Sequence, residues 1–343
     1  MLDNFNPNDP GQPNGNYFAL PYESGEGDIE IISVPWDVTT SYKPGTAKGP
    51  QAIIDASVQV DLFDPDVEKA WEIKISNTEL DIYQLNEDNR LVAEEVITYL
   101  ESGGHSYDKE IAALLAQVNQ ASQTVNDLVY ETAKNILNKG KVAAVVGGEH
   151  SVPLGLIKAV AEVFPGVGVL HIDAHADLRH AYEGFKYSHA SIMYNVIHEV
   201  ENISQLTQVA IRDFCEEEKL LAENNSKIRM FTDMDLKEEQ YMGKTWDKQC
   251  DEIIATLPQQ VYISFDIDGL YPYLCPNTGT PVPGGLEFDQ TMYLLRKLVK
   301  SGRKIVGFDL NEVSPGETGD WDANVGARAL FKLCCYTYLS NAI

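Results

Sequence analysis

The stretch Val167–Arg179, which decides both the fold and the candidate site, reads V-G-V-L-H-I-D-A-H-A-D-L-R. Its apolar beginning is typical of a buried strand, and Asp173, His175 and Asp177 then alternate with alanines. Because alternate side chains of an extended backbone point the same way, these three groups can project together from a strand end. Burying two carboxylates and an imidazole there is costly unless a cation compensates their charge. A solvated turn is the plainer alternative, but the stretch favours a metal site.

Short apolar segments alternate with amphipathic segments along the rest of the chain. We expect strands at residues 29–35, 73–82, 142–146, 167–172, 206–211, 228–231, 261–265 and 305–310. We expect helices at residues 50–62, 91–100, 111–137, 153–164, 190–200, 216–223, 245–257, 288–301 and 325–339. This alternation predicts an α/β protein with one parallel sheet covered on both faces. Residues 1–27 are expected to form an irregular leader, and residues 28–343 a single domain.

The composition narrows the classes of partner. A formal net charge of −26 argues against nucleic acid and anionic membranes, which need a basic protein face, and it suits a small cationic substrate. No stretch approaches the roughly 18 apolar residues of a membrane span, and no signal peptide is visible. The five cysteines are scattered, which predicts reduced thiols and a cytoplasmic protein.

Two further polar clusters follow predicted strands. Val145–Ser151 reads V-V-G-G-E-H-S and places His150 after a Gly-Gly turn, although a lone histidine there is more often structural. The segment 264–272 reads S-F-D-I-D-G-L-Y-P and presents Asp266 and Asp268 in alternation. The three clusters together offer four carboxylates, which would balance the charge of two divalent cations. Two neighbouring metal ions of this kind generate hydroxide from water at neutral pH. A ligand set rich in oxygen and free of thiolate suits manganese better than zinc.

These motifs resemble the signatures of the ureohydrolase family, which includes arginases, agmatinases, formimidoylglutamases and guanidine-type hydrolases. G-G-E-H-S, D-A-H-A-D and S-F-D-I-D-G, followed by N-T-G-T-P-V, match in order, and the likeness runs from P-W-D-V-T-T-S-Y to D-L-N-E-V-S-P. The resemblance implies an arginase-like three-layer α/β/α sandwich with a central, mostly parallel sheet of about eight strands. It also implies two Mn²⁺ ions per subunit, with Ni²⁺ as the alternative, and a homotrimer or homohexamer.

The resemblance further implies which residues bind the metals. One ion would be held by His150, Asp173, Asp177 and Asp266. The second would be held by Asp173, His175, Asp266 and Asp268. Asp173 and Asp266 would therefore bridge the two ions.

Substrate and catalytic residues are carried over in the same way. Glu312 would hold the planar guanidinium through two parallel hydrogen bonds. Thr280 resembles a family threonine near the substrate. His189 resembles a loop histidine that passes a proton to the leaving amine, a task for which an imidazole is well suited. Asp268 would help to stabilise the tetrahedral intermediate, and the products would be an amine and urea.

Some positions depart from the family pattern and bear on the substrate. Arg179 stands where arginases have Asn, which makes arginine a poorer candidate and would suit a substrate carboxylate. Thr39, Thr40 and Trp321 could instead narrow the pocket for guanidine, although Trp321 is equally a packing residue. Y-S-H-A-S-I around His189 is closer to agmatinases.

Two smaller departures leave the metal ligands untouched. Glu149 replaces the more usual Asp, and Tyr271 stands where D-G-L-D-P would have Asp.

The predicted function is an agmatinase-like hydrolase that converts agmatine to putrescine and urea, a step of polyamine biosynthesis. A guanidine or guanidino-acid hydrolase and a formimidoylglutamase are alternatives within the family. A single-zinc deacetylase-like enzyme and a non-catalytic family member are alternatives from different classes.

Overall fold

The computed structural model describes residues 5–9, 11–317 and 319–342, and its centre is a sheet of eight parallel strands in the order β2-β1-β3-β8-β7-β4-β5-β6. The strands are β1 (Ile29–Val34), β2 (Ile75–Glu79), β3 (Val142–Gly147), β4 (Gly168–Ile172), β5 (Gln205–Ile211), β6 (Ile228–Thr232), β7 (Gln260–Asp266) and β8 (Lys304–Asn311). Each predicted strand corresponds to one of these eight.

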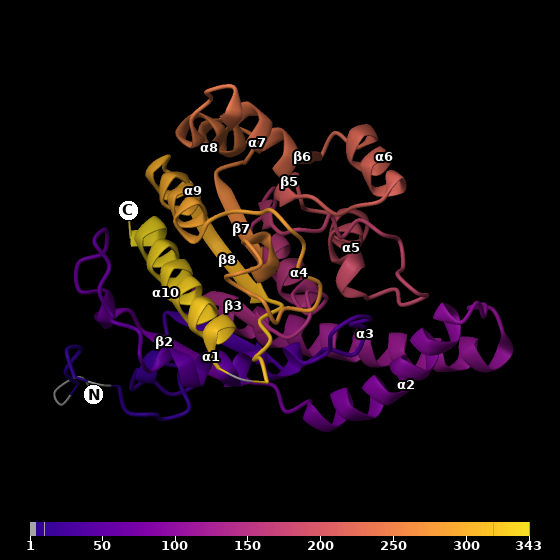
Figure 1. Cartoon of the computed structure of the whole chain (residues 1–343). Helices are drawn as coiled ribbons and strands as arrows, with labels where there is room; N and C mark the ends of the chain where they lie inside the picture. The colour runs from indigo at the N-terminus through magenta and orange to yellow at the C-terminus, as the bar shows by residue number, and fades with distance from the viewer. Residues whose placement is uncertain (1–4, 10, 318, 343) are drawn as a thin grey trace.

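Helices cover both faces of the sheet. They are α1 (Gly49–Ser57), α2 (Tyr83–Glu101), α3 (Lys109–Leu137), α4 (Leu154–Val163), α5 (Ile192–Glu199), α6 (Glu216–Asn224), α7 (Asp233–Tyr241), α8 (Trp246–Ala255), α9 (Phe288–Lys300) and α10 (Trp321–Ala342). One apolar core lies under α1, α8, α9 and α10, and a second lies under α2, α3, α4 and α5. Figure 1 shows α9 and α10 on one side of the strands and α4 and α5 on the other. The predicted α/β/α sandwich is therefore confirmed.

Several helices differ from the prediction. The helix α1 ends at Ser57 rather than at residue 62, and α10 extends from Trp321 to Ala342 rather than over residues 325–339. The largest differences concern α2 and α7, because little apolar surface marks them. The helix α2 begins at Tyr83 rather than Leu91, and its first turns bury Asn86 and Asn89 instead of aliphatic side chains. The side chain of Asn86 accepts a hydrogen bond from the backbone N–H of Asp37 (2.8 Å). The helix α7 was not predicted at all, because Leu236 is its only buried apolar residue.

The N-terminal segment packs on the first of the two cores. Tyr17 and Phe18 are almost completely buried, and they belong to a short 3₁₀ turn, Tyr17–Ala19. The backbone N–H of Phe18 donates to the Ser57 hydroxyl (2.7 Å), and the Tyr17 hydroxyl lies 2.8 Å from that of Ser33. The described part of the predicted leader is thus attached to α1 and β1.

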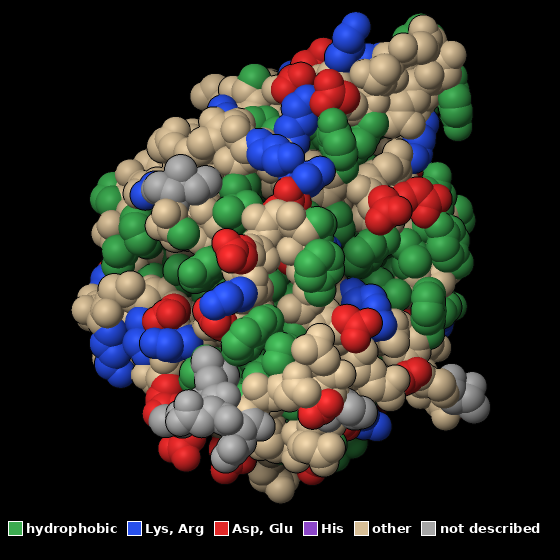
Figure 2. Space-filling view, turned by 90° about the vertical axis from the view of Figure 1, so that its left-hand side faces the viewer, with side chains coloured by type: hydrophobic (Ala, Val, Ile, Leu, Met, Phe, Trp, Pro, Cys, Tyr) green, Lys and Arg blue, Asp and Glu red, His purple; other side chains and the backbone are tan. Residues whose placement is uncertain are grey.

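The charge on the protein surface and the length and apolar character of its helices bear on whether nucleic acid or a membrane is a partner. On the face drawn in Figure 2, acidic and basic side chains are interspersed, so its described residues form no continuous basic surface for a phosphate backbone. Within the described ranges, no helix combines the length and the apolar character needed to cross a bilayer.

Candidate metal centre and active site

The candidate site lies where four neighbouring strands, β3, β8, β7 and β4, end. His150 follows β3, Glu312 follows β8, Asp266 ends β7, and Asp173 directly follows β4. Since these strands are parallel and adjacent, their carboxyl ends bring the three sequence motifs to one edge of the sheet. The six predicted metal ligands are therefore neighbours in space.

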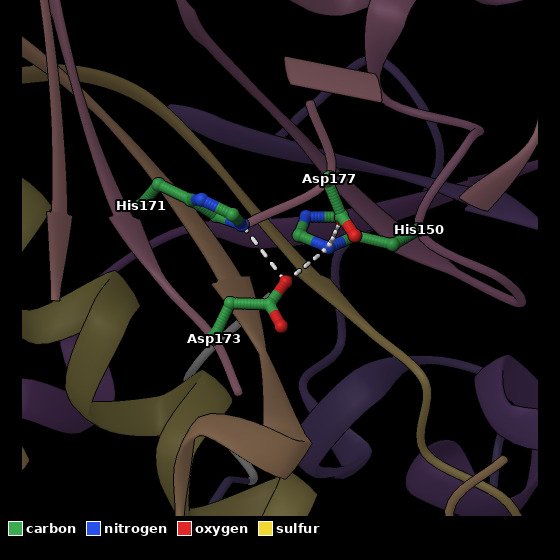
Figure 3. Close-up of side chains that lie close together, drawn as sticks. All are labelled: His150, His171, Asp173 and Asp177. Carbon is green, nitrogen blue, oxygen red and sulfur yellow. Dashed lines mark hydrogen bonds and ion pairs between the residues drawn. The ribbon is translucent and has the colours of Figure 1, made fainter. Parts of the chain in front are cut away.

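The first group of ligands surrounds His150. Its Nδ1 lies 2.9 Å from Oδ2 of Asp173, 3.3 Å from Oδ2 of Asp177 and 3.4 Å from Oδ2 of Asp266. All four side chains are buried. Figure 3 shows the Asp173 carboxylate turned toward the rings of both His150 and His171. Three carboxylates and one imidazole nitrogen thus converge on a single point.

The second group adjoins the first through Asp173. Nδ1 of His175 lies 3.1 Å from Oδ2 of Asp268 and 3.4 Å from Oδ1 of Asp173. The other oxygen of Asp268 accepts a hydrogen bond from the backbone N–H of Ala174 (3.0 Å), and the N–H of Asp268 donates to Asp266 (2.8 Å). Asp173 belongs to both groups, in keeping with its predicted bridging position.

A buried polar layer beneath the cluster fixes the ligand orientations. Nε2 of His150 lies 2.9 Å from the Ser264 hydroxyl, which donates to Asp309 on β8 (3.0 Å). Ser264 and Asp309 are register partners in the sheet. Such partners leave the opposite nitrogen, Nδ1, free to bind a metal. His171, predicted to be a packed supporting residue, lies 2.8 Å from Asp173 through Nε2.

The electrostatics of the cluster call for positive charge. Burial, reinforced by neighbouring carboxylates, raises the pKa of Asp266 well above its usual value and that of Asp177 to about 6. Burial by itself would lower the pKa of His150, but its carboxylate neighbours hold that pKa well above the ordinary value. When no metal ion is bound, the protonated His150 ring supplies the positive charge that a bound metal cation would otherwise supply. This donor set, oxygens with two imidazoles and no thiolate, fits divalent manganese or a similar ion.

Glu312 is held close to the cluster by an unusual backbone. Its φ is +61°, its N–H donates to the carbonyl of Gly148 (2.8 Å), and its Oε1 accepts from the N–H of His150 (2.7 Å). Burial and the nearby Glu149 raise the pKa of Glu312 well above its usual value. A cation beside this carboxylate would relieve that penalty. A Cβ on Gly148 would lie 2.0 Å from the Trp36 carbonyl oxygen, so only glycine fits this turn.

A pocket of about 370 Å³ opens beside the cluster of predicted metal ligands. Its lining includes His175, Asp177, Arg179, His189 and Thr280. Three residues predicted to contact the substrate or carry protons, Arg179, His189 and Thr280, therefore share one cavity with predicted metal ligands. Burial, together with His175 and His150, lowers the pKa of His189 to about 3, so its ring is neutral at pH 7.

Arg179 lines this pocket and is partly exposed. Its Nε lies 3.7 Å from Glu218, and its guanidinium carbon lies 5.1 Å from the Tyr182 ring centroid. Both Glu218 oxygens already accept backbone N–H groups. Within the described residues, the Arg179 guanidinium makes no hydrogen bond, so its donors are available to a ligand.

Other predicted residues lie away from the pocket lining. Trp321 is 51% exposed, and its indole N–H donates to the backbone carbonyl of Tyr273 (2.9 Å). Tyr271 stacks on Tyr273 with ring centroids 5.8 Å apart. Thr39 and Thr40 are buried beneath the pocket and turn their hydroxyls toward Glu149. This placement gives the suggestion that Thr39, Thr40 and Trp321 narrow the pocket no support.

Sequence reasoning did not identify the residues that support the predicted ligands. Ser264 and Asp309 begin the motifs S-F-D-I-D-G and D-L-N-E-V-S-P, but their contact beneath His150 arises only from the pairing of β7 with β8. Gln208 on β5, whose side-chain amide lies 3.0 Å from Nδ1 of His171, carries no motif signal. Glu149, whose departure from the family Asp leaves the predicted ligands untouched, is fully buried and accepts several hydrogen bonds. A buried carboxylate inside a metal motif could have been the signal.

Comparison with known proteins agrees with the fold and the motifs. The sequence model of the arginase family matches residues 27–336. The N(1)-aminopropylagmatine ureohydrolase of Thermus thermophilus is 31% identical over 90% of this chain and 89% of its own length. The agmatinase of Pyrococcus horikoshii is 28% identical over 89% of this chain and 90% of its own length. Among solved structures, proclavaminate amidino hydrolase from Streptomyces clavuligerus superposes with a TM-score of 0.72, at 25% identity, over 95% of this chain and 97% of that one. The chain therefore belongs to the arginase family of ureohydrolases, as its motifs predicted.

Proposed function

We propose that this chain is a binuclear metal hydrolase that cleaves the guanidino C–N bond of agmatine, giving putrescine and urea. The observation that carries the proposal is a separate buried carboxylate, Glu312, beside a cluster of carboxylates and imidazoles. The cluster suits two cations, and the separate carboxylate suits a planar cationic group. The convergence of all six predicted ligands weighs against a non-catalytic family member, and the family match weighs against a deacetylase-like enzyme.

The proposed cofactors are two Mn²⁺ ions, with Ni²⁺ as the alternative. Their ligands would be those assigned from the motifs, namely His150, Asp173, His175, Asp177, Asp266 and Asp268. When bound, the ions would supply a hydroxide nucleophile at neutral pH and neutralise developing negative charge. Without them, four buried carboxylates would share one site at a high desolvation cost.

The other residues would bind and orient the substrate. Glu312 would accept two parallel hydrogen bonds from the guanidinium and fix its plane. Thr280 would line the opposite wall of the pocket. Asp268 would help to stabilise the tetrahedral intermediate, and His189 would carry a proton to the departing amine. Each of these groups lies at the strand ends or lines the adjoining pocket.

Agmatine is favoured by the acidic groups of the pocket and by the family likeness. Asp213 and Glu218 line the pocket together with Asp177, and these carboxylates would attract the distal ammonium of agmatine. The relatives described above include an agmatinase and an aminopropylagmatine ureohydrolase. Cleavage of agmatine would place the enzyme in polyamine biosynthesis.

A guanidino acid is the second candidate, because the Arg179 guanidinium lines the pocket and makes no hydrogen bond to the described residues. A carboxylate at the far end of the substrate would pair with it. Guanidine and formimidoylglutamate are further alternatives. We also propose a single domain over residues 28–343 and a homotrimer or homohexamer. A cytoplasmic location is proposed because all five cysteines are free thiols.

Product analysis tests the proposal. Protein loaded with Mn²⁺ or with Ni²⁺ is incubated separately with agmatine, guanidine, arginine, guanidinobutyrate and formimidoylglutamate, and urea, formamide and ammonia are measured. Urea from agmatine, retained in the Arg179→Gln variant, would support the agmatine assignment. Urea from guanidinobutyrate that is lost in the same variant would favour the guanidino acid. No product from any substrate by protein that holds two ions would refute the proposal.

A further inference from the structure

We propose that Thr39 and Glu149 form a positioning pair that fixes the ring orientation and the tautomer of His189. The inference rests on the proposed function only in that His189 is taken to be the proton carrier. The pair itself is defined by contacts between three segments far apart in the sequence, the loop after β1, the turn after β3 and the loop before α5.

Glu149 is the fixed end of this arrangement. Its side chain is fully buried and accepts hydrogen bonds from the Thr39 backbone N–H (2.8 Å) and from the hydroxyls of Ser151 (2.7 Å) and Thr40 (3.3 Å). The Thr39 hydroxyl lies 2.9 Å from both carboxylate oxygens. This many donors on one carboxylate leave it as a pure acceptor in a single orientation.

The Thr39 hydroxyl can therefore act toward His189 only as an acceptor. Its one hydrogen is directed to Glu149, and its lone pairs face the His189 backbone N–H (3.2 Å) and the ring Nδ1 (3.3 Å). The backbone N–H is a donor in any protonation state. For Nδ1 to be compatible with the same oxygen, it must carry the proton of the neutral ring.

Among the described residues, Ser188 is the one neighbour whose hydroxyl could favour the other tautomer. Its hydroxyl oxygen lies 3.4 Å from Nδ1 and already accepts the backbone N–H of Ala190 (3.2 Å). If Ser188 donated to Nδ1, two lone pairs would face each other across the 3.3 Å between Nδ1 and Thr39. A proton on Nδ1 shared between the two hydroxyl oxygens satisfies all three groups.

The consequence for the pocket is an unprotonated Nε2. Within the described part of the chain, this nitrogen has no hydrogen-bond partner, and His189 lines the pocket beside His175 and Asp177. The ring is further confined by Tyr182, whose ring meets it edge-on with centroids 5.9 Å apart. His189 is thus ready to accept a proton at Nε2 and to release it from that same atom to the amine.

The length of the Glu149 side chain allows it to reach Thr39 and form the positioning pair. Residue 149 must reach back from the turn after β3 to the loop after β1, and Glu is one methylene longer than the Asp expected from the motif. We expect Glu149→Asp to withdraw the carboxylate from Thr39 and so release the hydroxyl to rotate.

The first test is the tautomer of His189 in the wild-type protein. Histidine labelled with ¹⁵N is observed by NMR in metal-free protein and in protein loaded with diamagnetic Zn²⁺, and the His189 signals are assigned with a His189→Gln variant. The expected result is a proton on Nδ1 and none on Nε2. A neutral ring protonated on Nε2 overturns the proposal, whether or not any variant folds.

The second test separates positioning from general structural damage. Thr39→Val removes the hydroxyl at nearly constant volume, and Thr39→Ser restores it. We expect Thr39→Val to lower kcat by about 10²-fold with KM within about threefold, and to give a mixture of tautomers, because a misoriented group loses catalysis rather than binding. Thr39→Ser should recover the wild-type tautomer and most of kcat. Assays run well above pH 7 keep Glu149, whose pKa burial raises to about 7, ionised.

Ser151→Ala is the matched control, since it removes one hydrogen bond from the same carboxylate without touching His189. It should leave the His189 tautomer unchanged. Thr39→Val with the wild-type tautomer and wild-type kcat would refute the pairing. If no substrate of the panel gives product, the proposed function fails, but the NMR result still decides the positioning.

Discussion

Replacing Glu312 by Gln is the sharpest perturbation of substrate binding that the site offers. The carboxylate is 6% exposed, and its Oε1 accepts the N–H of His150 at 2.7 Å. An amide oxygen can keep that hydrogen bond, so the metal motif should hold its shape. The amide NH₂ would then occupy the place of Oε2 and point donors at the donors of the guanidinium.

The expected loss follows from the two hydrogen bonds that the guanidinium would make. A charge-assisted hydrogen bond contributes about 1.5–3 kcal/mol, so two of them correspond to about 3–6 kcal/mol, or a fall in kcat/KM of about 10²–10⁴-fold. Because the backbone contact of Glu312 survives, the midpoint of thermal unfolding should change little. The metal content should stay at two ions per subunit.

Urea release from agmatine and elemental analysis of the same preparations measure these outcomes. The control is Glu317→Gln, which changes the same charge at an exposed position of the same loop. Its kcat/KM should equal that of the wild type. A Glu312→Gln enzyme that holds two ions and keeps kcat/KM within tenfold of wild type would remove Glu312 from guanidinium recognition, and the reasoning would be wrong.

Three other predictions follow from the cluster and from one ion pair. Asp266→Ala should lose bound metal and activity together, because a shared ligand is removed; two retained ions by elemental analysis would contradict this. Chelation should lower the thermal midpoint by about 5–10 °C, and Mn²⁺ should restore it, whereas an unchanged midpoint would show that no ion stabilises the fold. A hydrogen bond and the charge of Arg296 lower the pKa of Asp66 below 3.8. The Asp66–Arg296 pair therefore stabilises the protein above that pH, and this stabilisation is lost as the pH falls through the folded-state pKa. Asp66→Asn should consequently reduce the dependence of the unfolding free energy on pH in the acid range. An identical pH dependence in the variant and the wild type would refute this prediction.

The strands and the positions of the candidate metal ligands could be predicted because both leave local signals, whereas the assignment of each ligand to an ion came from the family resemblance. Buried parallel strands appear as short apolar runs, and ligands at their carboxyl ends appear as polar residues directly after those runs. Asp173 directly follows β4 and Asp266 is the last residue of β7, whereas His150 stands three residues beyond the end of β3. Their convergence needed no knowledge of strand order beyond the expectation of one parallel sheet.

Contacts between distant segments could not be predicted in the same way. Thr39 and Glu149 are separated by 110 positions, and nothing in either segment signals that they pair. The same holds for Ser264 under His150, which depends on the register of β7. The helix α7 was missed because tertiary packing of a single leucine, rather than a periodic apolar face, holds it on the fold.

Asp177 shows where the argument from alternation was right for an incomplete reason. The strand β4 ends at Ile172, and Asp177 adopts a left-handed backbone with a φ of +54°, so extended alternation does not by itself bring its carboxylate to His150. Left-handed geometry in a residue other than glycine costs about 1–3 kcal/mol and persists only where its surroundings impose it. Here the carbonyl of Asp177 accepts the Tyr194 N–H (3.0 Å), and the next N–H donates to Glu218 (3.0 Å). Glu312 shares the left-handed conformation. Two of the site's carboxylates are thus aimed by backbone strain that the surrounding fold maintains.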